Sequence, residues 1–356
     1  MTYISPSAKV LANIDRVVDW RRGRHVAPVT VEWDLSNRCT LGCTACHFAH
    51  THTRGPWATQ KRVLPMAFDP CGDLADTAVV MRALQEMAHA GVKGIVWSGG
   101  GEPTTHPDWL PIVQATAEAG LEQGMYTLGG LLTEETGARL AQLASWVVVS
   151  LDCADAETYA AEKGVPAARF EAACAGVQSL AGGPATVGVS FLLHAENWRR
   201  ADAMLALARE LGATYATFRP AIHADPQHPA TATDDRSWIS NALTTLTWLA
   251  QASDVEIDVS RFLAYRDWSG RSYAQCKGIQ LTTTVTPDGR VWVCPQRRGF
   301  RGSSLGDLSR ESFAAVWARH PYAWTDFSDC RVMCRLHTVN EQIAATEGPV
   351  LHGAFV

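Results

Sequence analysis

Three cysteines lie close together early in the chain, at Cys39, Cys43 and Cys46, with the spacing Cys-x3-Cys-x2-Cys. Thiolates are soft ligands that select zinc, copper(I) or iron–sulfur clusters. A [4Fe–4S] cube needs four ligands, so a local set of three thiolates leaves one iron open to an external molecule. The spacing therefore predicts a metal site, and an iron–sulfur cluster with one open position is the occupant that we favour.

Two other metal groups fit the same residues. The segment 43–47, Cys-Thr-Ala-Cys-His, matches the attachment pattern of a c-type haem. That attachment goes with export, and the N-terminus shows no apolar signal segment. A zinc site built from Cys39, Cys43, Cys46 and His47 is chemically possible. A packing role fits less well, because the segment is polar and loop-like.

A glycine run follows the second predicted strand, as Ser-Gly-Gly-Gly-Glu-Pro at residues 98–103. Glycine lets a backbone approach a ligand closely, and the carboxylate of Glu102 can hold an ammonium group. The run lies one strand–helix unit after the cysteine loop, so we expect both motifs to face one ligand.

Four later cysteines form a second group. Cys276 and Cys294 flank a predicted hairpin at 281–294, and Cys330 and Cys334 follow a predicted helix at 308–319. These four cysteines can enclose one metal site, either a structural zinc or an iron–sulfur cluster. Three further cysteines stand alone: Cys71, Cys153 and Cys174.

Bulk composition excludes several classes of protein. The 356 residues carry a net charge of −5, which argues against a dedicated nucleic-acid binder. No signal peptide and no run long enough for a membrane span are found. We therefore expect a cytoplasmic protein without nucleic-acid or membrane partners, in which the ten cysteines are not structural disulfides.

Strand-like and helix-like segments alternate between residues 29 and 222. The predicted strands are short, apolar and rich in β-branched residues, as buried parallel strands are. They are Val29–Leu35, Val92–Ser98, Gln123–Thr127, Trp146–Leu151, Val187–Leu193 and Tyr215–Arg219. Helices are predicted between them, for example at Leu74–Ala90 with Gly91 as its C-terminal cap. A further helix at Ser237–Ala252 and a short strand at Val255–Val259 follow.

This alternation predicts an α/β fold, a partial (β/α)6 barrel with a small α+β domain behind it. We expect an N-terminal extension at 1–28, the barrel at 29–259 and the cluster-binding domain at 260–356. Chemistry in barrels of this type occurs at the carboxyl ends of the strands.

The two motifs CTLGCTAC and GGEP, at the ends of the first and second strands, resemble the radical S-adenosylmethionine (SAM) superfamily. The resemblance implies that the three cysteines hold a [4Fe–4S] cluster whose open iron binds SAM. Reductive cleavage of SAM then yields a radical that takes a hydrogen atom from the substrate. An electron donor such as flavodoxin or ferredoxin is implied as a partner. Gly100, Gly101 and Glu102 are implied to hold the amino group of SAM, and Ala45 departs from the usual aromatic residue.

Later strand ends extend the same resemblance. Ser150 and Ser190 are expected to contact the carboxylate or ribose of SAM, together with Asn197. Ordinary hydrogen bonding at strand ends is the alternative role for each of them.

The order CKG…VTPDGRVWVCPQ…C…C resembles the SPASM and twitch domains of many radical SAM enzymes. Four cysteines favour the shorter twitch type with one auxiliary [4Fe–4S] cluster, which implies electron transfer because no iron is left open. The spacing Cys330-x3-Cys334 is wider than the expected Cys-x2-Cys, so the fourth ligand is the least secure.

The substrate is predicted to be a small polar molecule of the sugar, nucleoside or aminocyclitol type. About thirty residues precede the first strand, fewer than a peptide-recognition domain needs. By resemblance, the reaction is an oxidation, epimerisation or decarboxylation in natural-product biosynthesis. Two alternatives stay open: a radical SAM maturase of peptides, and a non-catalytic zinc-binding module.

Candidate substrate contacts lie in two loops at the predicted barrel mouth. They are His50, His52 and Arg54 after the first cysteine loop, and Arg219 and His223 after the sixth strand. Arg219 suits a phosphate or carboxylate. Surface-loop residues without a role, or for His50 and His52 a metal pair that lacks a third ligand, are the alternatives.

Cys153 follows the fourth strand and is the candidate donor of a hydrogen atom to a substrate radical. A small loop residue without chemistry is the alternative.

Overall fold

A single mixed sheet forms the frame of the protein in a computed structural model, which describes residues 6–44, 46, 48, 51–56, 68–221, 237–267, 269–327, 330 and 334–347. Within these residues ten strands pair in the order β10-β9-β8-β1-β2-β3-β4-β5-β6-β7. The strands are β1 (Thr30–Asp34), β2 (Gly94–Ser98), β3 (Glu122–Thr127), β4 (Trp146–Ser150), β5 (Thr186–Leu193), β6 (Tyr215–Pro220), β7 (Glu256–Asp258), β8 (Thr282–Val285), β9 (Arg290–Trp292) and β10 (Ser304–Asp307).

The strands β1 to β7 run parallel, each paired with the next along the chain. All six predicted strands of the barrel are present, and the predicted short strand becomes β7. Most residues of β1 and of β3 to β6 are buried, as the β-branched runs predict, whereas β2 alternates and β7 is only partly buried. The predicted α/β partial barrel is thereby confirmed.

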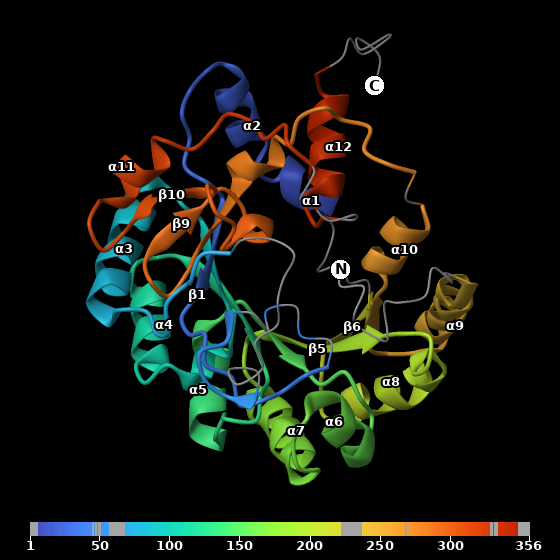
Figure 1. The fold of residues 1–356 in the computed structure, drawn as a ribbon. Helices are drawn as coiled ribbons and strands as arrows, with labels where there is room; N and C mark the ends of the chain where they lie inside the picture. Colours follow the sequence, from blue (N-terminus) through green and yellow to red (C-terminus); the bar gives the residue numbers. More distant parts are fainter. Residues whose placement is uncertain are drawn as a thin grey trace.

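Helices cover the outer face of the curved sheet in an arc from α3 to α9 (Figure 1). The helices of the barrel are α3 (Thr77–Ala90), α4 (Trp109–Glu118), α5 (Glu134–Leu143), α6 (Ala156–Lys163), α7 (Ala168–Leu180), α8 (Ala201–Glu210) and α9 (Ser237–Ala252), with the short 3-10 turns η3 (Pro103–Thr105) and η4 (Trp198–Arg200). Asp76 caps α3 by accepting from the amides of Ala78 and Val79, and Gly91 ends it with a φ of 90°. None of the helices in these described ranges has the length and apolar character that a membrane span requires.

The C-terminal hairpin extends the barrel's sheet instead of forming a separate one. β8 pairs parallel with β1, and β9 pairs antiparallel with β8. The remaining elements of this region are α10 (Ser260–Arg266), η5 (Gly278–Leu281), η6 (Pro295–Arg297), α11 (Phe313–Trp317) and α12 (His337–Ala345). The predicted hairpin is confirmed, and the division of the chain at residue 259 stays a prediction.

The helix predicted at 308–319 is shorter in the structure, where α11 covers only Phe313–Trp317. Asp307 accepts from the amide and hydroxyl of Ser309, at 2.8 and 2.7 Å, and so fixes a turn where the helix was expected. Ser312 then starts the helix as its N-terminal cap.

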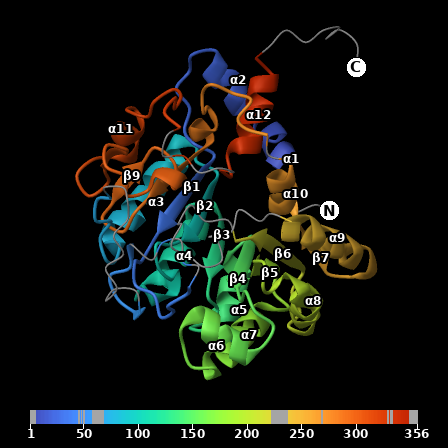
Figure 2. The same cartoon turned by 45° about the vertical axis from the view of Figure 1, so that its right-hand side comes forward.

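The N-terminal helices pack against the C-terminal helix. Figure 2 shows α1 (Pro6–Leu11) and α2 (Ile14–Arg21) beside α12. Val17 and Trp20 of α2 form a small core with Ile343, and Arg21 donates to the carbonyl of Thr346 at 2.8 Å. The predicted extension is thus joined to the end of the described chain.

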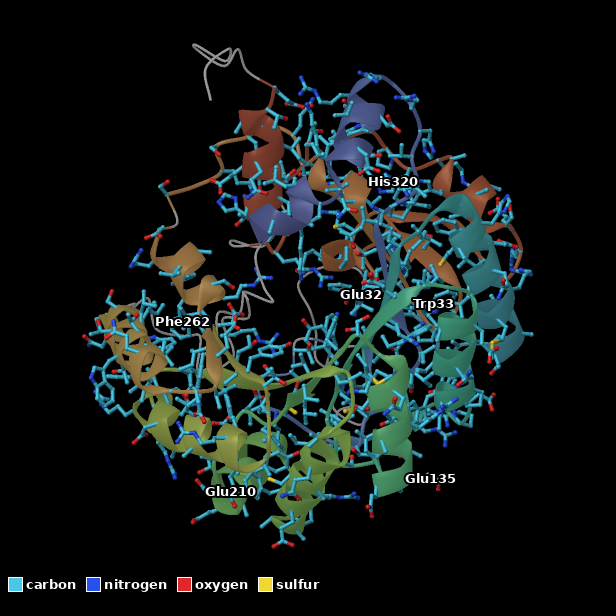
Figure 3. All side chains as sticks on the ribbon, turned by 180° about the vertical axis from the view of Figure 1, so that it is seen from behind. Glu32, Trp33, Glu135, Glu210, Phe262 and His320 are labelled. Atoms are coloured by element: carbon cyan, nitrogen blue, oxygen red, sulfur yellow. The ribbon has the colours of Figure 1, made fainter. Side chains whose placement is uncertain are left out.

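Strand β1 carries alternating apolar and acidic side chains. Glu32 and its neighbour Trp33 are marked in Figure 3. Because successive residues of a strand face opposite sides, Glu32 and Asp34 share the inner face of the barrel. Trp33 packs on the outer side, 6.2 Å between ring centres from Trp97 of β2.

Arginines from the C-terminal region neutralise these two buried carboxylates. Arg298 lies 2.5 Å from Glu32 and 3.0 Å from Asp34, and Arg335 also pairs with Glu32. Burial alone would raise the pKa of Glu32, but Arg335 and Arg298 lower it to about 2. Burial raises the pKa of Asp34 to about 7, although Arg298 acts against this.

We expect Arg298→Gln to lower the free energy of unfolding by about 3–5 kcal/mol, because it removes the cation paired with buried Asp34 and one of the two cations paired with buried Glu32. Anaerobic denaturant titration measures the change. Arg301→Gln is the matched control, since the Arg301 side chain is 71% exposed, and it is expected to change stability by less than about 0.5 kcal/mol. Equal losses in the two variants would contradict the role of this buried network.

Candidate active site between two cysteine groups

A cavity of about 470 Å³ opens at the carboxyl ends of the parallel strands. Its walls come from strands β1 to β6, from α6 and α10, and from the segments that follow Cys294 and Cys334. Cys39, Cys43 and Cys46 all line it, as do residues 98–102 of the glycine run. The two motifs that were predicted to share a ligand therefore face one space.

The first cysteine loop is tied to the barrel by backbone hydrogen bonds. The amide of Cys39 donates to the carbonyl of Arg54 at 3.2 Å. The amides of Gly42 and Thr44 donate to the carbonyls of Lys163 and Glu162, at 2.7 and 2.9 Å. The end of α6 thus holds the loop in place over the cavity.

The glycine run has a packing role that sequence reasoning missed. The amide of Gly101 donates to the carbonyl of Ser36 at 3.0 Å. A Cβ atom on Gly100 would meet the side-chain oxygen of Asn37 at 2.1 Å, and one on Gly101 would meet the carbonyl of Arg38 at 2.2 Å. Glycine is therefore required where β2 ends against the start of the cysteine loop, apart from any contact with a ligand.

The carboxylate of Glu102 joins the ends of β2 and β3. One oxygen accepts from the hydroxyls of Thr104 and Thr127, at 2.5 and 2.7 Å. The other accepts from the amide of Leu128 at 2.8 Å. Burial raises the pKa of Glu102 while these donors act to lower it. Its predicted contact with the amino group of SAM stays a prediction.

An acidic residue after β4 was not singled out from the sequence. Asp152 lines the cavity and has a φ of 64°, a left-handed conformation that is uncommon without glycine. It pairs with Lys163, the last residue of α6. Burial would lower the pKa of Lys163, but Asp152 and Cys43 raise it. The second oxygen of Asp152 is buried and accepts no hydrogen bond from the described residues.

The predicted SAM contacts on later strands divide into two groups. Ser150 lines the cavity. Ser190 accepts from Arg219 at 2.5 Å. Asn197 accepts from the amide of His194 and donates to the carbonyl of Leu192, at 2.8 and 3.0 Å. Neither Ser190 nor Asn197 is among the residues that line the cavity, and contact of either residue with SAM stays a prediction.

Two of the predicted substrate contacts reach the cavity. Arg219 lines it, and so does His52, whose Nε2 lies 3.8 Å from the sulfur of Cys46. Arg54 is exposed and is not among the lining residues. Two further predicted contacts, and a residue of the zinc alternative, fall outside the described residues: His50, His223 and His47.

Cys153 is fully buried in the hydrophobic core and does not line the cavity. Burial raises the pKa of its thiol. Hydrogen-atom donation by Cys153 stays a prediction that this placement does not support.

The second cysteine group comes together around a small core of its own. Burial raises the pKa of Cys294, and the nearby thiols of Cys334, Cys276 and Cys330 raise it further as neighbouring charges. Asn340 donates to the sulfur of Cys276 at 3.1 Å, and the amide of Leu336 donates to the sulfur of Cys334 at 3.4 Å. Such donors stabilise thiolates that hold a cluster.

Both cysteine groups suit a cube better than a single ion. Across the described ranges, no three His, Cys, Asp or Glu side chains converge closely enough to hold one metal ion. In a [4Fe–4S] cluster each thiolate binds a different iron, so the ligands stand farther apart. Four grouped thiols fit a fully ligated cluster, and three thiols on an open cavity fit a cluster that exposes one iron.

The cavity lies between the two groups. Pro295 and Gln296, which follow Cys294, line its wall, and so does Arg335, which follows Cys334. The first group lines the same cavity from the barrel side.

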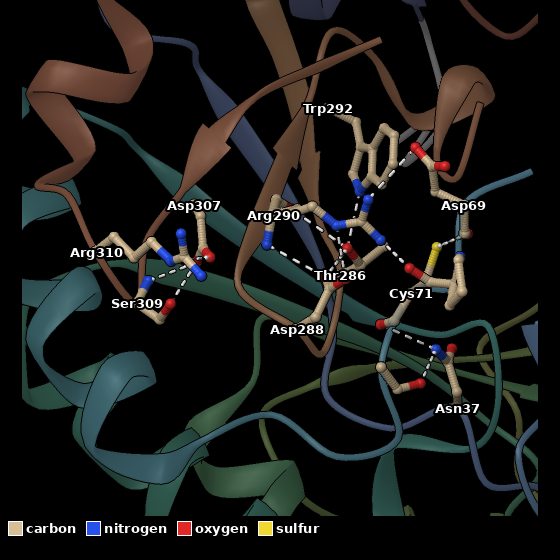
Figure 4. A network of polar contacts seen from close by, with 12 residues as sticks. Asn37, Asp69, Cys71, Thr286, Asp288, Arg290, Trp292, Asp307, Ser309 and Arg310 are labelled. Carbon is tan, nitrogen blue, oxygen red and sulfur yellow. Dashed lines mark hydrogen bonds and ion pairs between the residues drawn. The ribbon is translucent and has the colours of Figure 1, made fainter. Parts of the chain in front are cut away.

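A polar network joins the two regions (Figure 4). Asn37, two residues before Cys39, donates to the carbonyls of Cys71 and Gly72, at 3.2 and 2.8 Å. The amide of Asp288, at the tip of the hairpin, donates to the same carbonyl of Cys71 at 3.3 Å. The side chain of Asp288 in turn accepts from Thr286 and Arg290, at 2.6 and 2.7 Å. The cysteine loop and the hairpin therefore share one support.

We expect Gly100→Ala to displace the first cysteine loop, because the added methyl group collides with Asn37. Iron per chain after anaerobic reconstitution should fall by roughly half, since one of two [4Fe–4S] clusters is affected. Gly130→Ala is the control, because a Cβ there meets nothing nearer than 3.8 Å. Full iron content in Gly100→Ala would show that the loop tolerates the methyl group.

Comparison with protein-family models identifies both regions. Residues 33–208 match the radical SAM superfamily, and residues 276–338 match the SPASM iron–sulfur cluster-binding domain. The PqqA peptide cyclase of Gluconobacter oxydans is 30% identical over 83% of this chain and 77% of its own length. The mycofactocin maturase MftC of Mycobacterium tuberculosis is 26% identical over 88% and 74%. The AdoMet-dependent heme synthase of Methanosarcina barkeri is 32% identical, over 52% of this chain and 49% of that protein.

Solved structures agree with the fold. Streptococcus suis SuiB bound to S-adenosylmethionine superposes with a TM-score of 0.63 at 15% identity, over 88% of this chain and 72% of that one. The enzyme anSMEcpe with bound AdoMet superposes with a TM-score of 0.60 at 14% identity, over 82% and 80%. The chain is thus a radical SAM enzyme with a C-terminal SPASM domain, and its cofactors are SAM, a SAM-binding [4Fe–4S] cluster and an auxiliary [4Fe–4S] cluster.

Proposed function

We propose that this enzyme modifies a peptide by radical SAM chemistry, in the cavity between its two cysteine groups. The observation that carries the proposal is the shared wall: Cys39, Cys43 and Cys46 line the same space as Gln296 and Arg335, which stand beside the auxiliary cysteines. The peptide class is supported by the 30% identity with a PqqA peptide cyclase over most of both chains.

The prediction of a small polar substrate is wrong, and so is the small molecule as partner. The relatives that match most of the chain are named a peptide cyclase and a mycofactocin maturase. The prediction failed because it rested on the length of the segment before β1. The length of that segment does not determine which substrate the cavity binds. Membership of the radical SAM superfamily also removes the zinc-module alternative.

When bound, SAM and its cluster supply a radical that abstracts a hydrogen atom from the substrate. We assign the cluster to Cys39, Cys43 and Cys46, and the orientation of SAM to the end of β4. The Asp152 oxygen that accepts no hydrogen bond from the described residues would accept one from the ammonium or a ribose hydroxyl of SAM, and Ser150 lines the same cavity. Lys163 keeps a positive charge beside Cys43 and fixes the carboxylate of Asp152.

The auxiliary cluster is assigned to Cys276, Cys294, Cys330 and Cys334. Four protein ligands leave no iron for the substrate, so electron transfer is its proposed role. Asn340 and the amide of Leu336 place hydrogen-bond donors on two of these sulfurs. Donors of this kind raise a cluster's reduction potential, which favours acceptance of an electron from the cavity.

The peptide assignment is tested with peptides encoded beside the gene for this enzyme. Each is incubated anaerobically with reconstituted enzyme, SAM and a reductant, and is analysed by mass spectrometry. We expect one peptide to change mass while 5′-deoxyadenosine forms, and the triple variant Cys39→Ala, Cys43→Ala, Cys46→Ala to give neither product. Unchanged peptides, together with conversion of a small metabolite, would overturn the assignment.

The auxiliary assignment predicts a split between two activities. Cys294→Ala should still cleave SAM, because the first cluster is intact, while its yield of modified peptide falls by about tenfold or more. Cys174→Ala is the control, since Cys174 lies on α7 and belongs to neither group. Normal peptide yield in Cys294→Ala, with iron lost from the auxiliary site, would exclude the electron-transfer role.

A further inference from the structure

The charged groups that line the cavity are paired in most cases. Lys163 pairs with Asp152, and Arg335 pairs with Glu32. The remaining lining carboxylates also have donors: Glu162 accepts from His194 at 2.8 Å, and Glu102 accepts from threonine hydroxyls and backbone amides. Each of these lining carboxylates thus already has a cation or a hydrogen-bond donor, and one buried oxygen of Asp152 has no partner among the described residues.

Two arginines in the same wall lack such a partner. Arg219, at the end of β6, donates to the hydroxyl of Ser190 at 2.5 Å, and its Nε is buried with no acceptor among the described residues. Arg261, on the first turn of α10, forms no ion pair with a carboxylate of the described residues. Burial lowers the pKa of Arg261, and the positive charges of Arg335 and Arg219 lower it further. Two guanidinium groups of the wall are therefore left without a carboxylate partner among the described residues.

Arg261 lies within electrostatic range of Arg219 and of the second cysteine group. Cys334 and Tyr126 are among the groups whose charge acts on Arg261 and on Arg335. Lys163 is the lining cation near the first cysteine group, because the charge of Cys43 raises its pKa. The end of β4 and the end of α6 therefore serve the SAM side, and Arg219 and Arg261 are left for the substrate.

Figure 3 marks Phe262, the residue after Arg261, which anchors this part of α10. Phe262 is fully buried and packs edge-on against Trp238 of α9, 6.0 Å between ring centres. Arg219 is held from the other side by its bond to Ser190 of β5. Both guanidinium groups are thus carried by rigid elements, which is what orientation of a substrate requires.

We propose that Arg219 and Arg261 form a carboxylate-binding subsite for the peptide, which takes an acidic side chain or the C-terminal carboxylate. This proposal rests on the proposed function and specifies which feature of the peptide the enzyme binds. A guanidinium matches a carboxylate with two parallel hydrogen bonds. Carboxylate is also the anion that every unmodified peptide carries, at its C-terminus or on Asp and Glu. Binding there compensates the two charges and places the adjoining residue in the cavity between the clusters.

Three pools of N-acetylated decapeptides, random at the other positions but with Asp and Glu excluded there, test this subsite on immobilised, reconstituted enzyme with SAM bound. The first pool carries one glutamate and an amidated C-terminus. The second pool has glutamine in place of that glutamate, and the third adds a free C-terminal carboxylate to the second. Retention of each pool is measured by mass spectrometry. Preference for the first pool over the second identifies an acidic side chain, and preference for the third over the second identifies the C-terminus.

We expect a carboxylate-bearing pool to be retained about tenfold or more over the neutral pool, as a charge-assisted pair implies. Arg261→Gln and Arg219→Gln should each reduce that ratio towards one. The ratio is internal to each variant, so a partly inactive preparation does not change it. Arg266→Gln is the matched control, because Arg266 is on the same helix but is exposed and paired with Asp267 at 2.6 Å, and its ratio should stay as in the wild type.

Equal retention of all three pools by the wild type would overturn the subsite while leaving the peptide assignment standing. Retention of no pool would contradict the peptide assignment, and the subsite with it. The dissociation constant of SAM is measured in the same variants. A weaker SAM complex with an unchanged pool ratio would assign the two arginines to the carboxylate of SAM and would also overturn the subsite.

Discussion

The acidic inner face of β1 is the constraint on which the placement of both cysteine groups depends. Glu32 and Asp34 are buried because β1 lies in the middle of the sheet, between β2 and β8. A buried carboxylate is costly unless a cation accompanies it. Arg298 and Arg335 fill that role, and they stand four residues after Cys294 and one residue after Cys334. The ion pairs that compensate the buried carboxylates of β1 therefore also hold the segments after Cys294 and Cys334 beside the cavity.

The wall of the cavity near the first cysteine group follows a similar rule with different partners. Lys163 lies next to Cys43, and its charge is balanced by Asp152. Asp152 reaches this position through a left-handed backbone conformation, φ 64°, which is strained for a residue with a side chain. Such strain persists where the surroundings enforce it, and here the amide of Asp152 donates to the carbonyl of Ser190 at 3.1 Å. Local strain is thus tolerated at a point that serves the site.

Local patterns were enough to predict the strands, the hairpin and both cysteine groups, because each depends on residues near one another in the chain. The partners that complete the site were not predictable in this way. Glu32 meets Arg298 and Arg335 across 266 and 303 residues of sequence, and no periodicity links such positions. The residues of the glycine run were noticed, but their packing against Asn37 and Arg38 needed the fold. Helix α11 was overestimated because a side chain, Asp307, competes for the backbone at its start.

Charge in the cavity is a better guide to the substrate than the length of the chain before the barrel. The N-terminal helices pack against α12 and contribute no residue to the cavity wall among those described. The wall instead carries Lys163 near the first cysteine group and Arg335 near the second, with Arg219 and Arg261 as further cations. A substrate that enters the cavity must supply the negative partner that Arg219 and Arg261 do not have among the described residues. Arg335 lines the cavity directly after Cys334 but is already paired with Glu32, so Arg219 and Arg261 are the lining arginines whose charge a substrate can still neutralise.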